Sequence, residues 1–333
     1  MSGELTEVTE IATALGMLAP SLPEALKARP PELLNLSDDA WTRLVASSLD
    51  PSYATAFDTA FSNGRAFLEA SQGLRGRRPF RVEWKGPHRP PGDDVIPADL
   101  RIDHVFLVSC KYLSRVLLNP GPQRLFERLL VGEQRGGTNW FVECAPDQFQ
   151  AFYEAAVTFG DLENVPALVT DLSKAQQNVL KKTLWRRALP EDLAGPWSEL
   201  CTAVASESAR RWNEALTSRT TKLRLLWRML RISGASYFVL GTDKSDHLRL
   251  RVDSAWDWGQ MYELRNLTVT ARTAGQPEVE WHATVRRKLD GADLAIDGHV
   301  EIRWSHGRFV GVPESKVYLD TPHALVPGYH ALT

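Results

Sequence analysis

The chain has 333 residues, of which 43% are hydrophobic and 24% charged, with a formal net charge of −2. This balance is typical of an ordinary globular protein and argues against a disordered chain. No apolar run reaches the roughly 18–20 residues of a membrane span, and the acidic start Met1-Ser-Gly-Glu is unlike a signal peptide. Three cysteines, Cys110, Cys144 and Cys201, lack metal-ligand spacing and predict neither a zinc site nor a disulfide framework. We therefore expect no membrane partner and a reducing, cytoplasmic location.

The N-terminal third is predicted to be mostly helical. Residues 1–50 read as short helices separated by prolines, and Ser37 is placed to cap one of them. Residues 52–71 predict a stronger helix, because aromatic and aliphatic side chains recur every three or four positions. Phe80–Trp84 alternates in polarity and predicts a strand.

The most informative segment is residues 96–112, which predict two strands joined by a tight turn. Asp99 lies on the first strand, and Ser109 and Lys111 share one face of the second, since side chains alternate along a strand. Asp99 and Ser109 can meet only if they lie directly opposite each other. The residue numbers of every opposed pair must then add up to 208, which requires the three-residue loop 103–105 or a bulge. A slip of one residue would send Ser109 to the other face.

Downstream, the sequence alternates between helical and strand patterns. A helix is expected from about Pro122, a strand at Asn139–Cys144, a helix from Pro146, and helices over residues 171–231. From Ala235 the period changes to two, which predicts six strands of an antiparallel sheet or barrel. The fold class is therefore α+β. We expect an N-terminal helical segment (1–50), a nuclease-like domain (51–170), a basic helical linker region (171–232) and a C-terminal antiparallel β domain for binding or sensing (233–333).

Within residues 52–145, the expected order of helix, three strands, helix and strand resembles the PD-(D/E)xK superfamily, the restriction-endonuclease-like fold. Asp99, in Pro97-Ala-Asp99, matches the first acid of the family, with one residue inserted after the proline. Ser109-Cys110-Lys111 matches the (D/E)xK triplet, with serine in place of the acid. Glu69 matches the acid that many members carry on the preceding helix.

The resemblance implies a metal-dependent nuclease that hydrolyses phosphodiester bonds, with Asp99, Lys111, Glu69 and Ser109 as catalytic residues. Mg²⁺ (or Mn²⁺) would be held by the carboxylates of Asp99 and Glu69 and by the backbone carbonyl of Cys110. A divalent ion neutralises the charge that builds on the phosphate and activates the attacking water, and Mg²⁺ prefers such oxygen ligands. Lys111 would orient the water or stabilise developing charge. Ser109 is a poorer ligand than an acid.

The charges are unevenly distributed. Residues 1–60 hold nine acidic and three basic residues, whereas residues 171–231 hold twelve basic and six acidic ones. The basic region is compatible with a polyanionic partner, and equally with a solvated helix face that pairs with the acidic N-terminus. The nucleic-acid contacts predicted from these patterns are Gln123, Arg124, Lys181, Lys182, Arg186 and Arg187.

Three classes of function follow. The first is a nuclease of restriction or anti-phage defence, acting on nucleic acid, with DNA favoured over RNA; a homodimer or a partner protein is compatible with this. The second is a non-catalytic subunit of a defence or repair assembly that binds nucleic acid or a partner through a degenerate nuclease fold. The third is a β domain that binds a small ligand and regulates the nuclease. Glu69, Asp99 and Lys111 favour the first, and Ser109 favours the second.

Overall fold

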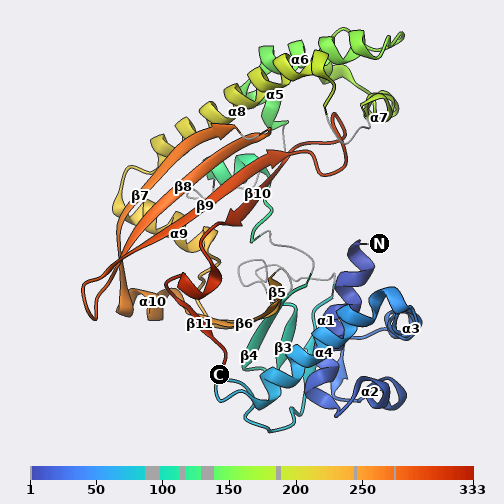
Figure 1. Ribbon diagram of the computed structural model, residues 1–333, viewed down its shortest axis with the longest axis vertical. Helices are drawn as coiled ribbons and strands as arrows, with labels where there is room; N and C mark the ends of the chain where they lie inside the picture. The colour runs from blue at the N-terminus through green and yellow to red at the C-terminus, as the bar shows by residue number, and fades with distance from the viewer. Residues whose placement is uncertain are drawn as a thin grey trace. The chain divides into compact units, whose positions relative to one another are not determined.

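The computed structural model describes residues 2–86, 98–112, 117–128, 139–184, 189–243, 246–273 and 275–333. The chain forms two compact units (Figure 1). Unit 1 comprises Met1–Arg115, Arg231–Met261 and Pro322–Thr333, and unit 2 comprises Val116–Leu230 and Tyr262–Thr321. Each unit is thus assembled from segments far apart in the sequence, and the units cut across the four consecutive segments expected from the sequence.

Unit 1 is built on a mixed seven-stranded sheet with the strand order β1-β2-β3-β4-β5-β6-β11. Its strands are β1 (Leu33–Leu34), β2 (Val82–Trp84), β3 (Leu100–Ile102), β4 (Phe106–Lys111), β5 (Tyr237–Asp243), β6 (Asp246–Val252) and β11 (Tyr329–Ala331). The pairs β1–β2 and β4–β5 are parallel and the others antiparallel. Its helices are α1 (Ser2–Leu18), α2 (Leu22–Ala28), α3 (Asp38–Ser48), α4 (Ala54–Glu69) and α10 (Ala255–Met261).

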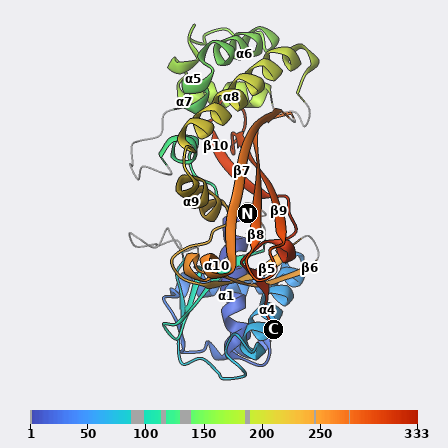
Figure 2. The same ribbon diagram turned by 90° about the vertical axis from the view of Figure 1, so that its left-hand side faces the viewer.

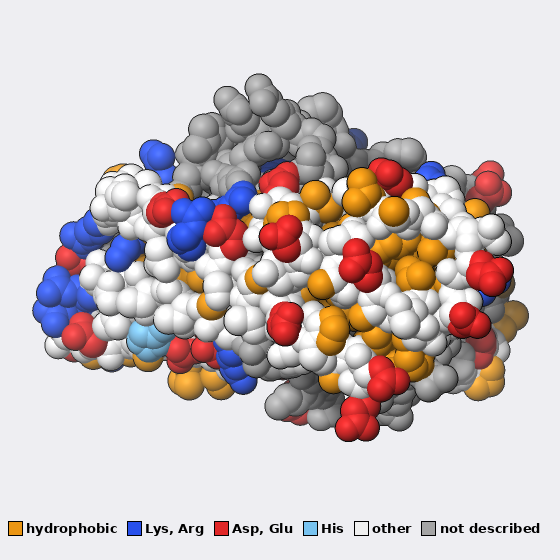
Figure 3. Space-filling model, turned by 90° about the horizontal axis from the view of Figure 1, so that it is seen from above, with side chains coloured by type: hydrophobic (Ala, Val, Ile, Leu, Met, Phe, Trp, Pro, Cys, Tyr) orange, Lys and Arg blue, Asp and Glu red, His pale blue; other side chains and the backbone are white. Residues whose placement is uncertain are grey.

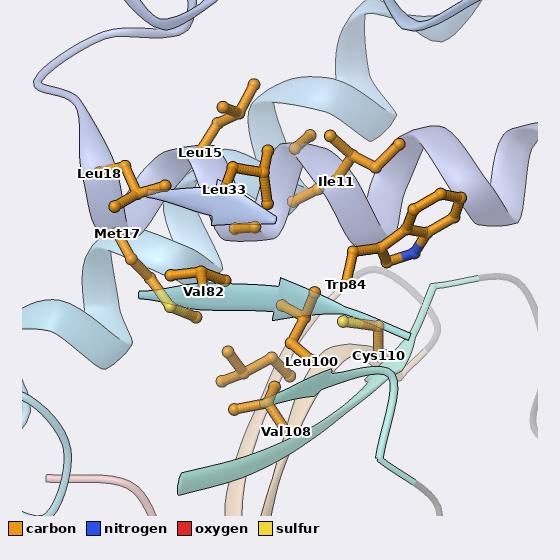
Figure 4. Close-up of a cluster of buried hydrophobic side chains, with 14 of the residues drawn as sticks. Ile11, Leu15, Met17, Leu18, Leu33, Val82, Trp84, Leu100, Val108 and Cys110 are labelled. Carbon is orange, nitrogen blue, oxygen red and sulfur yellow. The ribbon is translucent and has the colours of Figure 1, made fainter. Parts of the chain in front are cut away.

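The core of unit 1 lies between one face of this sheet and helices α1 and α4. Buried side chains of α1, among them Ile11 and Met17, and of the strands, among them Val82 and Val108, belong to this core (Figure 4). The two helices touch at glycines: a Cβ at Gly64 would lie 2.0 Å from the carbonyl oxygen of Thr13. A residue with a side chain cannot fit there without moving a backbone.

Unit 2 is a four-stranded antiparallel sheet, in the order β10-β9-β8-β7, covered by helices. The strands are β7 (Tyr262–Thr273), β8 (Pro277–Arg287), β9 (Asp293–Arg303) and β10 (Glu314–Leu319); the helices are α5 (Trp140–Cys144), α6 (Pro146–Phe159), α7 (Lys174–Thr183), α8 (Ala194–Ala215) and α9 (Arg219–Met229). Helix α8 runs along β7 and β8 (Figure 2). Alternate strand residues, including Val279, Trp281 and Val300, are buried beneath the helices. The alternation places charged residues on the other face.

The α+β class and most elements agree with the sequence patterns, but two expectations are wrong. Asn139–Cys144 forms a helical turn, α5, rather than a strand. The side chain of Asn139 caps this turn by accepting a hydrogen bond from the Phe141 N–H, and Trp140 and Phe141 are buried. The expected C-terminal antiparallel domain is also divided, because β5 and β6 extend the sheet of unit 1 whereas β7–β10 form the sheet of unit 2.

The helix expected from about Pro122 is a short π-helical turn at Arg124–Arg128. In the part of the chain that the structure describes, no helix combines the length and the apolar character needed to cross a membrane.

Candidate functional site

The β3–β4 hairpin has the register that the site hypothesis requires. Leu100 opposes Val108, Arg101 opposes Leu107 and Ile102 opposes Phe106. The residue numbers of each pair add up to 208, which confirms the three-residue loop. Both Asp103 (φ 50°) and His104 (φ 60°) adopt left-handed backbone conformations in this loop, which Asp and Asn tolerate better than most residues.

The carboxylate of Asp103 anchors the turn. Its Oδ1 accepts from the backbone N–H groups of Phe80 (3.0 Å) and Arg81 (3.1 Å), and its Oδ2 accepts from Arg77 Nη2 (2.5 Å). Charge-assisted hydrogen bonds of this kind are among the stronger ones in proteins. Asp103 is therefore a structural acid that fixes the turn.

Asp99 and Ser109 meet on one face of the hairpin, as expected. Asp99 Oδ2 accepts from the Cys110 N–H (2.6 Å) and from Ser109 Oγ (3.3 Å). Asp99 is 5% exposed and Ser109 is fully buried. One of the two carboxylate oxygens of Asp99 is thus already hydrogen-bonded to the neighbouring strand.

Lys111, the last residue of β4, is half-buried and lies on the same face as Ser109. It pairs with Gly241 of β5, where a Cβ would lie 2.0 Å from the Lys111 carbonyl oxygen. Cys110 points to the opposite, core face; burial first, and then the charge of Asp99, raise the pKa of its thiol well above the usual range. The thiol is consequently inert at neutral pH.

Glu69 does not join this site. Helix α4 covers the opposite face of the sheet, where Phe67 packs its ring on Phe106 (5.6 Å between centroids) and on Phe238 (4.9 Å). Glu69 follows two residues later, at the end of α4, with a side chain that is 61% exposed and paired with Arg65 (3.2 Å). The sheet therefore separates it from the Asp99–Ser109 pair.

The residues present do not fit the magnesium centre that the resemblance implies. Within the described residues, no group of three or more His, Cys, Asp or Glu side chains is arranged to hold a metal ion. Opposite Asp99, at the position where the family triplet carries its second acid, stands Ser109. A site for Mg²⁺ usually offers one or two carboxylates that are accessible to the ion and its waters. Pro97, next to the motif, lies outside the described residues.

The residues expected to contact nucleic acid are spread over unit 2. The buried Gln123 donates from Nε2 to Glu143 Oε1 (2.7 Å), a bond inside the unit. Arg124 begins the π-helical turn and is exposed. Lys181 and Lys182 lie in the last turn of α7, where Lys182 is exposed. Arg186 and Arg187 lie outside the described residues.

Several cations of the basic region are paired with acids of the same unit. Arg210 pairs with Glu207 (2.7 Å), and Arg219 pairs with Glu263 of β7 (2.6 Å). The sequence left open that the basic region pairs with the acidic N-terminal residues. Arg210 and Arg219 instead pair with acids of unit 2. On the face shown in Figure 3, Lys and Arg side chains gather toward one end, mixed with acidic ones, and hydrophobic side chains toward the other. The formal excess of positive charge is thus partly neutralised locally.

A pocket of about 640 Å³ in unit 1 is lined by paired charges. Arg101 forms a two-point ion pair with Glu83, and Arg43 pairs with Glu7 at 3.1 Å. The Arg101 guanidinium lowers the pKa of Glu83. Lys85 also lines the pocket, so three cations stand against two acids in its lining.

A second polar centre, which the sequence patterns did not identify, surrounds Asn63 of α4. Asn63 is fully buried and contacts Tyr112, Gly241, His247 and Arg249 through its side-chain amide. Its only sequence signal is a polar residue on the apolar face of an amphipathic helix, three positions after Ala60 and four before Phe67.

No protein-family model, curated protein or solved structure matches this chain.

Proposed function

We propose that this chain is a nucleic-acid-binding protein with a nuclease-like core that does not cleave through a two-carboxylate magnesium centre. The observation that carries the proposal is the state of Asp99. Its carboxylate oxygen is bonded to the Cys110 N–H and faces Ser109, and the other expected acid, Glu69, lies across the sheet.

The nuclease-like part of the proposal is supported by the order of the elements in unit 1. Helix α4 is followed by the three-stranded meander β2-β3-β4, and a further strand, β5, pairs with β4. The first segment of unit 2, Val116–Leu230, lies between β4 and β5 in the chain and contains helices. The resemblance placed the last strand at Asn139–Cys144, which is helical; β5 takes that place in the order of elements.

The proposed absence of metal-dependent cleavage is supported by the chemistry of the side chains that would bind the metal. Metal-assisted hydrolysis needs a divalent ion that binds tightly enough to lower the pKa of a water and to neutralise the phosphate. A single buried carboxylate with a neutral hydroxyl beside it is a weak ligand set for Mg²⁺. The role that we propose for such a domain is to bind nucleic acid without hydrolysing it.

A magnesium-dependent nuclease is the second candidate. One observation favours it: Lys111 lies on the same strand face as Ser109 and the acid opposite it, which is the face relation that the (D/E)xK triplet requires.

One experiment separates the two candidates. The protein and its Asp99→Asn variant are incubated with supercoiled plasmid, single-stranded DNA and RNA, each with Mg²⁺, Mn²⁺ or EDTA, and binding is followed by fluorescence anisotropy in EDTA. We expect binding to at least one nucleic acid, weakened by salt because contacts to phosphates release counterions, and no metal-dependent cleavage.

Cleavage that needs metal and is lost in Asp99→Asn would contradict the proposal and establish the nuclease. Absence of binding to all three nucleic acids would contradict the binding role.

A further inference from the structure

The polar centre around Asn63 lies on the face of the unit 1 sheet that α4 covers. Tyr112 follows β4 directly, Gly241 belongs to β5, and His247 and Arg249 lie on β6. Arg249 opposes Leu240 and His247 opposes Thr242, so the side chains of Arg249 and His247 leave the sheet on the side opposite Ser109. The centre is therefore separate from the Asp99–Ser109 pair.

The hydrogen bonds fix the orientation of the Asn63 amide. The carbonyl oxygen of Gly241 can only accept, so the atom 2.8 Å from it is the amide nitrogen. Arg249 Nε can only donate, so its partner at 2.8 Å is the Asn63 oxygen. That oxygen also faces His247 Nδ1 at 3.0 Å, which requires the imidazole to carry its proton on Nδ1. Asn63 thus holds Arg249 and His247 side by side.

The chain of hydroxyl groups behind Asn63 is consistent with this orientation. Asn63 Nδ2 donates to Tyr112 Oη (3.3 Å), Tyr112 Oη lies 2.6 Å from Thr13 Oγ1, and Thr13 donates to the carbonyl oxygen of Thr9. Each hydroxyl therefore has one donor and one acceptor partner. The centre is built as a rigid network with fixed proton positions.

Arg249 is a half-buried cation without a matching acid. Its guanidinium donates to Asn63 and to Ser62 Oγ (3.0 Å), both uncharged. No ion pair links it to a carboxylate among the described residues, and burial lowers its pKa. Burying a charge without a counter-ion is unfavourable. The guanidinium has five N–H donors, so it keeps donors that an anion could accept from.

Arg251 lies two residues further along the same face of β6, and its charge is balanced by an acid, as is usual for an arginine that is partly buried. It pairs with the fully buried Asp253 at 3.1 Å, and Asp253 also accepts from His330 Nε2 at 2.8 Å. Strand β6 thus carries one arginine with its counter-ion in the chain and one without.

We propose that Arg249, with Ser62 and His247, is a binding site for a phosphate group. Guanidinium nitrogens match the spacing of phosphate oxygens and form charge-assisted hydrogen bonds with them. Ser62 Oγ accepts from Arg249 and keeps its own proton to donate. His247 is exposed, and its Nε2 is turned away from Asn63. The site does not depend on the proposed function, because it uses none of the residues of the β3–β4 hairpin face.

The test is isothermal titration with inorganic phosphate, at ionic strength held constant with chloride. We expect saturable binding to the full-length protein and binding weakened about tenfold or more in Arg249→Gln, since a hydrogen bond to a charged group contributes about 1.5–3 kcal/mol. Ser62→Ala is expected to weaken binding less. Arg29→Gln is the matched control: it removes a cation of the same unit that already has a partner, Asp38, and should bind phosphate as the wild type does.

Two further titrations identify the source of the phosphate. An oligonucleotide with a 5′-phosphate is compared with the same oligonucleotide ending in a 5′-hydroxyl. Tighter binding of the phosphorylated strand that Arg249→Gln abolishes assigns the site to a nucleic-acid end; binding of inorganic phosphate with no such difference assigns it to a free phosphate or small phosphate ester.

No saturable phosphate binding by the wild type, or equal binding by Arg249→Gln, would overturn the proposal. If Arg249→Gln unfolds, Ser62→Ala and His247→Asn carry the same test.

Discussion

Two polar centres lie on opposite faces of the same sheet and differ in how their charges are satisfied. On one face, the Asp99 carboxylate is bonded to the Cys110 N–H and to Ser109. On the other, the Arg249 guanidinium is held by the neutral groups of Asn63 and Ser62. The first centre has the residue types of a catalytic site but is closed on itself. The second has no recognisable motif, and its cation has no acid partner among the described residues.

The difference shows that residue type and spacing predict where polar groups lie. The hydrogen-bond donors and acceptors that are still free in the fold decide whether those groups can bind a ligand. An acid whose oxygen is already hydrogen-bonded holds a hairpin together, as Asp103 also does at the turn. A half-buried guanidinium that donates only to neutral groups keeps N–H donors for an anion.

The largest effect is expected from Ser109→Asp, which places a second carboxylate against Asp99. Ser109 is fully buried, so the two like charges would destabilise the fold by about 3 kcal/mol at neutral pH. Because the added acid restores the ligand that Mg²⁺ prefers, magnesium should recover part of this loss. Urea unfolding with Mg²⁺ and with EDTA measures both effects, and Ser109→Asn is the uncharged control. A fold as stable as the wild type in EDTA would mean that residue 109 does not face Asp99.

The next effect compares the two arginines of β6. Arg251→Gln leaves the buried Asp253 with only His330 and should lower the free energy of unfolding by about 2 kcal/mol. Arg249→Gln removes a cation that has no acid partner among the described residues and should change stability by less than about 1 kcal/mol. Urea unfolding in phosphate-free buffer checks the pair. An equal decrease in the free energy of unfolding for both variants would contradict the difference that we infer between Arg249 and Arg251.

The smallest effect is expected from Glu69→Gln. Glu69 forms an exposed pair with Arg65 one helical turn away, and such pairs contribute about 0.3–0.5 kcal/mol. Thermal unfolding should shift little, and any response to Mg²⁺ should remain that of the wild type. A magnesium response lost in Glu69→Gln would place this carboxylate at a metal after all.

The sequence predicted the hairpin well because its constraints are local. Opposition of Asp99 and Ser109 allows only one register, and the loop from Asp103 to Val105 satisfies it. The five-residue run Trp140–Cys144 was misassigned because short apolar runs carry no clear period and tertiary packing decides their form.

Non-local relations were out of reach of the sequence patterns. Strand β5 pairs with β4 across more than a hundred intervening residues, and local alternation does not specify a distant partner. The acid of Glu69 was assigned by its place in α4, but the face of the sheet on which a helix packs depends on the whole core. The partners of Arg249, Asn63 and Ser62, come from a helix distant in the sequence, which local patterns do not specify.

The central claim, that the Asp99 centre is closed to metal, is tested most directly by Mn²⁺ binding followed by electron paramagnetic resonance of the free ion. The wild type, Asp99→Asn and Ser109→Asp are titrated under identical conditions. We predict that wild type and Asp99→Asn bind Mn²⁺ equally weakly and that Ser109→Asp gains a site. A stoichiometric site in the wild type that Asp99→Asn removes would contradict the claim.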